Sequence, residues 1–132
     1  MSTLKEPTFG NGKICYIVMP AIDVNQSAAF YSTVFNWNIR QRDDGTVSFD
    51  DSVTEVSGTW VTGLKPSTNE GIMIFIMVAN AEKTILSIVE NGGTITQQIG
   101  QDFPEVTAQF SDPTGNIMGI YQQPGLEEQL GV

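Results

Sequence analysis

The chain has 132 residues, 40% of them hydrophobic and 16% charged, which predicts one globular domain and excludes a disordered chain. Its net charge of −9 predicts that it binds neither nucleic acid nor an anionic membrane surface. One cysteine and no histidine exclude an internal disulfide, Ser–His and Cys–His nucleophilic pairs, and a thiolate zinc site.

The first half of the chain predicts one helix and four strands. Residues 1–12 are polar, and we expect them to be flexible. Residues 13–19 are apolar at both alternating sets of positions, which predicts a strand covered on both faces. Asp23 begins a capping-box pattern, so a helix is expected from Val24 to about Phe35. Further strands are predicted at residues 37–42, 46–50 and 55–62.

The second half repeats this order after a polar linker, residues 65–70. A strand is predicted at residues 71–78, and a helix at residues 81–91 with Asn80 as its cap. Strands follow at residues 94–99, 106–111 and 117–122, and residues 123–132 form a polar tail. Asp112–Asn116 is a predicted tight turn between the last two strands.

The two halves therefore predict an internal repeat of the order βαβββ. Aligning the two helix caps, Asp23 and Asn80, places Tyr16 opposite Met73. Such a repeat favours two structural units, residues 13–64 and 71–122, that share a core within one domain.

Particular residues in this order resemble a known family. Ile17–Asp23, Ala29–Tyr31 and Val34–Trp37 resemble the opening module of the glyoxalase/bleomycin-resistance/dioxygenase superfamily, also called vicinal oxygen chelate. Asn36 stands where that pattern usually has glycine. Residues 71–93 resemble the second module, and Asp112–Asn116 resembles its terminal turn. The resemblance implies an α+β fold of two βαβββ modules, each with its sheet curled around a concave cleft and its helix on the outer face.

The resemblance also indicates where a metal would be held. Members that use a metal take ligands, usually His, Gln or Glu, from the first and last strands of each module. These positions fall on Tyr16, Met73 and Gly119, and near Thr62. None of these side chains is a normal ligand of a catalytic transition metal. We therefore expect no metal and no cofactor, and no catalytic residue is predicted.

Strand alternation extends these positions to a predicted cleft lining, because side chains two residues apart share a face. The predicted lining is Tyr16, Val18, Gly58, Trp60, Thr62, Met73, Phe75, Ile117, Gly119 and Tyr121. It is mainly aromatic and apolar, which suits a small flat or apolar molecule. The predicted ligand-binding residues are Tyr16, Trp60, Thr62, Met73, Phe75, Gly119 and Tyr121.

Several single residues allow two interpretations. Trp60 is either a core side chain or a stacking platform for a ligand. Tyr16 and Tyr121 either have satisfied hydroxyls in the core or bind a ligand. Arg40 and Arg42 are the only arginines, and they lie either on a solvated strand face or in a clamp for a carboxylate or phosphate.

Cys15 is expected to point away from Tyr16, toward the helix, as a buried and inert thiol. The chain has no apolar run of about 18 residues, so no membrane span is expected. Its first residues do not resemble a secretory signal, and a cytoplasmic location is expected.

Three functions remain open at this point. The first is a metal-free protein that binds a small apolar or aromatic molecule. The second is a glyoxalase-like or dioxygenase-like enzyme of the same fold, with lyase or isomerase chemistry. The third is a structural or interaction module whose cleft is filled by side chains. A homodimer is expected, because small modules with exposed sheet edges are commonly closed by a second chain.

Overall fold

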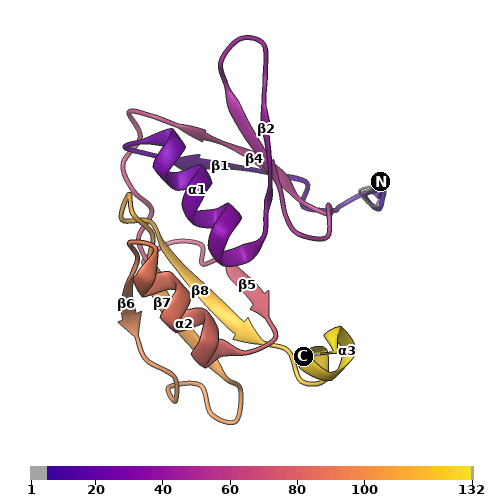
Figure 1. The fold of residues 1–132 in the computed structure, drawn as a ribbon, viewed down its shortest axis with the longest axis vertical. Helices are drawn as coiled ribbons and strands as arrows, with labels where there is room; N and C mark the ends of the chain where they lie inside the picture. Colours follow the sequence, from indigo (N-terminus) through magenta and orange to yellow (C-terminus); the bar gives the residue numbers. More distant parts are fainter. Residues whose placement is uncertain (1–5, 132) are drawn as a thin grey trace. The chain divides into compact units, whose positions relative to one another are not determined.

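The computed structural model describes residues 6–131, and the chain in it divides into two compact units between Lys65 and Pro66 (Figure 1). The first unit contains β1 (Tyr16–Pro20), α1 (Val24–Phe35), β2 (Asn38–Gln41), β3 (Val47–Asp50) and β4 (Ser57–Val61). The second contains β5 (Phe75–Val78), α2 (Ala81–Glu90), β6 (Thr94–Gln97), β7 (Thr107–Ser111), β8 (Ile117–Gln122) and α3 (Leu126–Leu130). Residues 1–5 of the predicted flexible segment, and Val132, lie outside the described part.

Each unit has one four-stranded sheet, and the two sheets have the same topology. The strand orders are β1-β4-β3-β2 and β5-β8-β7-β6. In each sheet the first strand pairs in parallel with the last, and the other pairs are antiparallel. The predicted α+β class with two βαβββ modules is confirmed. The core shared by the two modules stays a prediction.

The ends of α1 follow from two side chains. The Asp23 carboxylate accepts a hydrogen bond from the Gln26 backbone N–H at 3.1 Å, which satisfies one of the free donors of the first turn. Asn36 ends the helix with φ +60°, in the left-handed region. Glycine adopts this conformation most readily and asparagine tolerates it better than most residues, which explains how Asn36 replaces the usual glycine.

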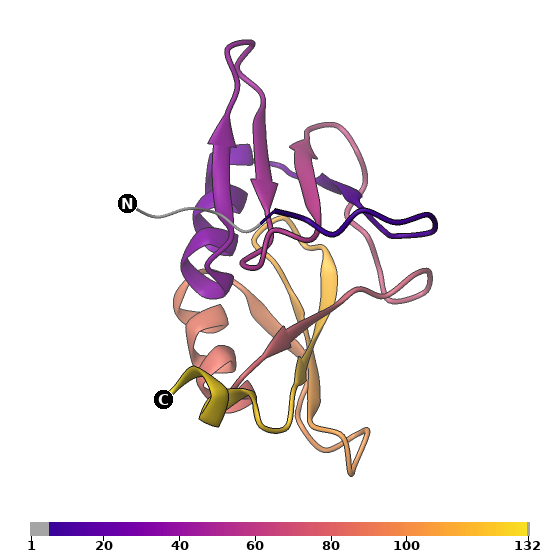
Figure 2. The same ribbon diagram turned by 90° about the vertical axis from the view of Figure 1, so that its right-hand side faces the viewer.

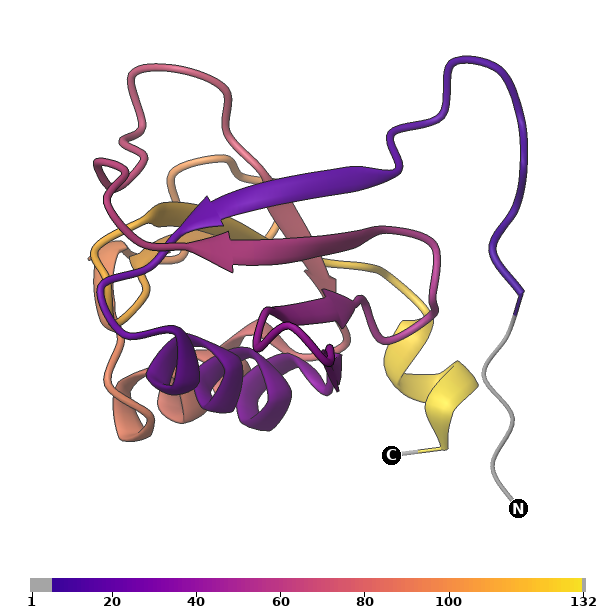
Figure 3. The same ribbon diagram turned by 90° about the horizontal axis from the view of Figure 1, so that it is seen from above.

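The core of the first unit is an aromatic cluster between α1 and one face of its sheet. Figure 3 shows α1 lying on one side of β1 and β4. Tyr31 of the helix stacks on Trp37 with ring centroids 4.6 Å apart, and Trp37 stacks on Phe49 of β3 at 4.5 Å. All three side chains are buried, and so is Met19 on β1. The face of this sheet turned toward α1 is therefore closed by large rings.

The second unit packs α2 against its own sheet (Figure 2). Ile88 of the helix and Phe110 and Ile120 of the sheet are fully buried. The predicted cap Asn80 accepts a hydrogen bond from the Lys83 N–H at 3.0 Å. The predicted polar tail contains α3, which the sequence pattern did not indicate; its Glu127 accepts a hydrogen bond from the Asn80 side chain at 3.1 Å.

The predicted turn before β8 is held by one carboxylate. Asp112 Oδ1 accepts hydrogen bonds from the backbone N–H groups of Thr114, Gly115 and Asn116 at 2.9–3.0 Å. The Asn116 side chain returns a hydrogen bond to Asp112 Oδ2. None of the helices in residues 6–131 combines the length and the apolar character that a membrane crossing requires.

Candidate functional site

The two faces of the first sheet differ sharply in exposure. In the β1–β4 pair, Met19 is opposite Trp60 and both side chains are buried toward α1. On the other face, Tyr16 is 49% exposed and Val18 is 53% exposed. The expectation that this strand is covered on both faces is wrong for these residues. We call the face that carries Tyr16 and Val18 the open face.

The predicted cleft lining mixes the two faces of this sheet. Val18 pairs with Thr59 in the first sheet, as Phe75 pairs with Gly119 in the second. The counterpart of Gly119 is therefore Thr59, three residues before the predicted Thr62. An odd shift along a strand moves every side chain to the opposite face. Gly58 and Trp60 were assigned to the open face for this reason, and that assignment is wrong.

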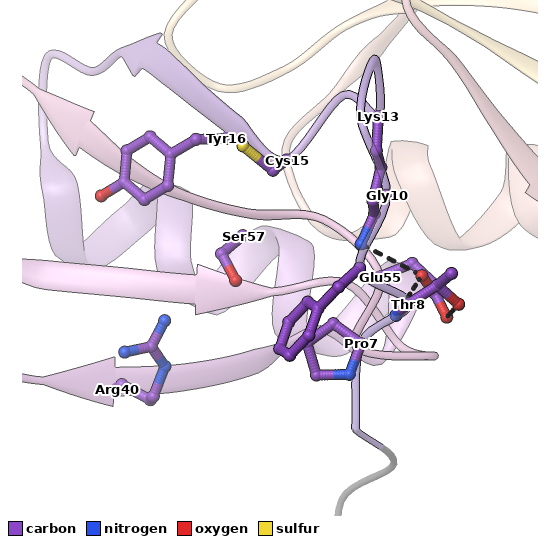
Figure 4. A pocket seen from close by; sticks show the side chains of 10 residues that line it. Pro7, Thr8, Gly10, Lys13, Cys15, Tyr16, Arg40, Glu55 and Ser57 are labelled. Atoms are coloured by element: carbon purple, nitrogen blue, oxygen red, sulfur yellow. Dashed lines mark hydrogen bonds and ion pairs between the residues drawn. The ribbon is translucent and has the colours of Figure 1, made fainter.

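A hollow of about 460 Å³ lies at the open face (Figure 4). Its floor comes from three strands, which supply Tyr16, Arg40 and Ser57. Its other side comes largely from the segment before β1, including Phe9. The full lining is Pro7, Thr8, Phe9, Gly10, Lys13, Cys15, Tyr16, Arg40, Glu55 and Ser57. We call this space the Tyr16–Arg40 hollow.

A buried carboxylate orders the polar part of the floor. Asp50 Oδ2 accepts hydrogen bonds from Arg40 Nε at 3.0 Å and from Asn38 Nδ2 at 3.1 Å. Asp50 Oδ1 accepts from Arg40 Nη2 at 3.0 Å and from the Ser57 hydroxyl at 2.7 Å. Burial acts to raise the pKa of Asp50, but these hydrogen bonds and the Arg40 charge outweigh it and hold the pKa below its ordinary value.

A second carboxylate fixes the segment that forms the other side of the hollow. Glu55 accepts hydrogen bonds from the Thr8 backbone N–H and from the Thr8 hydroxyl, both at 3.1 Å (Figure 4). It also forms an ion pair with Lys13 Nζ at 3.1 Å. Glu55, which precedes β4, therefore holds Thr8 of the segment expected to be flexible, and also the adjoining Lys13.

Cys15 lines the hollow and is exposed. The expectation of a buried thiol that faces the helix is wrong. The strand begins only at Tyr16, so the alternation of the strand does not govern the residue before it.

Two predicted ligand-binding residues lie elsewhere in the first unit. Trp60 is 4% exposed, with its ring 4.7 Å from that of Phe49 and 6.0 Å from that of Tyr31. Trp60 and Thr62 line a separate hollow of about 520 Å³ beside the start of α1 and the β2–β3 hairpin. No open space lies beside Trp60 at Gly58, because a Cβ built there would lie 2.3 Å from the Phe49 ring.

The remaining predicted residues belong to the second unit. Phe75 and Tyr121 share one face of its sheet, and the Phe75 ring lies over Gly119. Met73 is half-buried and precedes β5. Desolvation, the negative charge of Glu105 and a hydrogen bond with it raise the pKa of Tyr121, so its phenol is protonated at neutral pH.

The residues at the metal-ligand positions do not fit a transition metal. Within residues 6–131, the structure brings together no group of three His, Cys, Asp or Glu side chains that could hold an ion. Tyr16 offers an exposed phenol, Thr59 a hydroxyl and Gly119 no side chain. A transition metal prefers imidazole, thiolate or carboxylate ligands.

Sequence reasoning missed most of the polar floor. It treated Arg40 and Arg42 as equivalent, took Asp50 for a residue of a solvated turn, and did not consider Asn38 or Ser57. A signal was present: the turn at Asp43–Gly45 fixes a hairpin register in which Asn38 is opposite Asp50. Strand alternation then puts Arg40 on the same face as that aspartate.

Comparisons with known proteins agree on one family. The family model described as "Glyoxalase/Bleomycin resistance protein/Dioxygenase superfamily" matches residues 13–120. A "Glyoxylase-like domain-containing protein" from Didymella fabae is 28% identical over 125 residues, which is 87% of this chain and 97% of that protein.

Solved structures of the same superfamily share the fold. A glyoxalase/bleomycin resistance protein/dioxygenase family enzyme from Burkholderia phytofirmans has a TM-score of 0.69 at 15% identity, over 84% of this chain and 98% of that one. The fosfomycin resistance protein FosX from Listeria monocytogenes has a TM-score of 0.68 at 18% identity, over 91% and 97% of the two chains.

Proposed function

The chain belongs to the glyoxalase/bleomycin resistance protein/dioxygenase superfamily, and from that premise we propose that it is a metal-free protein that binds a small molecule with an aromatic or apolar part. One observation carries the proposal: an exposed tyrosine ring lies in a hollow on the open sheet face, beside ordered polar groups. We propose the Tyr16–Arg40 hollow as the site.

The chemistry of the hollow suits such a ligand. Its volume of about 460 Å³ lies within the range of about 300–1,000 Å³ found for small-molecule pockets. Tyr16 and Phe9 offer ring surface for stacking, while Ser57 and Arg40 offer hydrogen bonds that would fix orientation. The name of FosX connects one protein of this fold with resistance to a small molecule.

Binding is tested with a panel of small aromatic compounds, with and without divalent metal ions. A compound that binds only the folded protein raises its melting temperature. Tyr16→Ala is expected to weaken binding of the strongest compound by about tenfold, equivalent to about 1.4 kcal/mol. Phe103→Ala is the matched control, because Phe103 is a highly exposed ring that does not line the hollow.

Two results would contradict this proposal. If Tyr16→Ala and Phe103→Ala weaken binding equally, the Tyr16–Arg40 hollow is not the binding site. One equivalent of tightly held nickel, zinc or iron in dialysed protein without a histidine tag would favour the metal-dependent enzyme instead. Binding that is unchanged by the metals or by chelator is the expected outcome.

A further inference from the structure

We propose that the ligand of the Tyr16–Arg40 hollow is an aromatic carboxylate, and that the outer edge of the Arg40 guanidinium binds its carboxylate group. This inference rests on the proposed function and adds the chemical class of the ligand. Its basis is the way in which Asp50 occupies one side of the guanidinium and leaves the other available.

The two hydrogen bonds to Asp50 use one edge of the Arg40 fork. Nε and Nη2 each donate to a separate oxygen of the carboxylate at 3.0 Å. A guanidinium has five N–H groups, so both protons on Nη1 and the second proton on Nη2 remain. Within residues 6–131 the structure gives Nη1 no protein acceptor. Nη1 and Nη2 form a second edge with the spacing of a carboxylate.

The guanidinium is held in place before any ligand arrives. Asp50 is fixed in turn by the Ser57 hydroxyl at 2.7 Å and the Asn38 amide at 3.1 Å, so the anchor of Arg40 is itself constrained from two other strand positions. The Arg40 side chain is nevertheless 41% exposed. An oriented but accessible arginine loses little side-chain entropy on binding, which favours affinity.

The position of Tyr16 decides which kind of carboxylate fits. Tyr16 is opposite Ser57 in the β1–β4 register, and Ser57 is opposite Asp50 in the β3–β4 register. Figure 4 shows the Tyr16 ring and the Arg40 guanidinium on the same side of the sheet with Ser57 between them. A ligand whose carboxylate contacts Arg40 can therefore place an apolar ring beside Tyr16.

Few positive groups of this protein are available to bind the carboxylate of a ligand. The net charge of −9 disfavours small anions over most of the surface. The other cation of the hollow, Lys13, is paired with Glu55 at 3.1 Å. Arg42 lies on the exposed β2–β3 hairpin and does not line the hollow. Among the described residues that line the hollow, Arg40 is therefore the cation left available to an anion.

The test uses matched probes that differ only in charge: benzoate with benzamide, and indole-3-acetate with indole-3-acetamide. Affinity for the wild-type protein is measured by calorimetry at two salt concentrations. Each carboxylate is expected to bind at least tenfold more tightly than its amide, and added salt should reduce the difference. Arg40→Gln should lower carboxylate affinity to that of the amide, and Arg40→Lys should retain part of the preference. Arg42→Gln removes the same charge from the hairpin and should leave both affinities unchanged.

An independent measurement avoids substitution, because Arg40→Gln removes a partner of buried Asp50 and can destabilise the fold. In NMR spectra of the wild-type protein, the side-chain N–H resonance of Arg40 should shift on addition of benzoate and not on addition of benzamide. Amides that bind as tightly as carboxylates would overturn this inference and leave the proposed function intact. Failure of all four probes to bind would overturn this inference, and the lack of any binder in the panel of aromatic compounds would overturn the proposed function as well.

Discussion

The role of Trp60 depends on the face of β4 on which it lies and not on its residue type alone. An indole ring suits either a core or a ligand platform, and strand parity decided between them here. Trp60 is opposite Met19 and packs against Phe49 and Tyr31, so its ring closes the core beneath α1. Its indole N–H is buried without a hydrogen-bond acceptor among the described residues, so the ring contributes chiefly through apolar packing.

Trp60→Ala is expected to lower the free energy of unfolding by about 3–5 kcal/mol, because it leaves a cavity among large rings. Denaturant unfolding measures the change. Val61→Ala is the control on the neighbouring position of the same strand. Val61 is exposed, so its truncation should change stability by about 0.5 kcal/mol or less. Similar stabilities for the two variants would contradict the core position of Trp60.

Cys15 should react stoichiometrically with a thiol reagent in the folded protein, because its side chain is exposed at the hollow. Mass spectrometry after brief treatment with a maleimide counts the label. A compound bound in the Tyr16–Arg40 hollow should slow the reaction. A related compound that does not bind the protein should leave the rate unchanged. A thiol that reacts only after denaturation would contradict the exposed position.

Asp50 should make stability depend on pH in the acid range. Its folded pKa is lowered, so its contribution is complete above the unfolded pKa of about 3.9 and is lost as the pH falls through the folded value. Asp50→Asn should therefore destabilise the protein at neutral pH, with a gap to wild type that narrows on acidification. Asp43→Asn, in the exposed hairpin turn, is the control. A gap independent of pH would show that the Asp50 charge is not what stabilises the network.

At the scale of elements, α1 shows how local residues fix a boundary. Asp23 supplies an acceptor for the first turn, and Asn36 takes the left-handed conformation at the end. Both effects act within a few residues, so the boundaries of α1 were readable from the sequence. The last strand of the first module was less readable, because its flanking turns allow several alignments and a shift of one residue reverses its faces.

Asn36→Gly should keep or slightly raise the free energy of unfolding, since glycine adopts positive φ without steric cost. Asn36→Ala should lower it by about 1 kcal/mol, because a Cβ without a polar side chain is disfavoured there. Thermal unfolding of the two variants compares the effects at one position. Equal melting temperatures for the glycine and alanine variants would contradict the left-handed end of α1.

Within residues 6–131, each of the two sheets has one face with exposed apolar side chains and two edge strands. β1 and β2 are the edges of one sheet, and β5 and β6 are the edges of the other. Val18 lies exposed on the open face of the first sheet, and Met77 lies exposed on the face of the second sheet that carries Phe75 and Tyr121. Edges and apolar faces of this kind are commonly covered by another chain.

We propose on these grounds that the protein is a homodimer in solution. Light scattering at micromolar concentration should give twice the chain mass of 14.4 kDa. The mass should remain unchanged on dilution through the range in which small aromatic compounds are tested. A mass near 14.4 kDa at all concentrations would contradict the proposal.

The order of the helices and strands in the two modules, the ends of α1 and the family could be predicted from the sequence, whereas α3 could not. These depend on periodicity, capping and turn residues, which act over a few neighbours. The start of the helix after this strand was also indicated by the sequence, through Pro20 and the cap Asp23, but the exposure of Tyr16 was not expected.

Which side chains meet at the candidate site depends on contacts between strands that are distant in the sequence. Arg40, Asp50 and Ser57 come from three strands, and their contact depends on a register set by hydrogen bonds between those strands. The positions of Trp60 and Cys15 likewise depend on where β4 and β1 begin. Pairing across strands is a long-range property, so a pattern within any one segment leaves it undetermined.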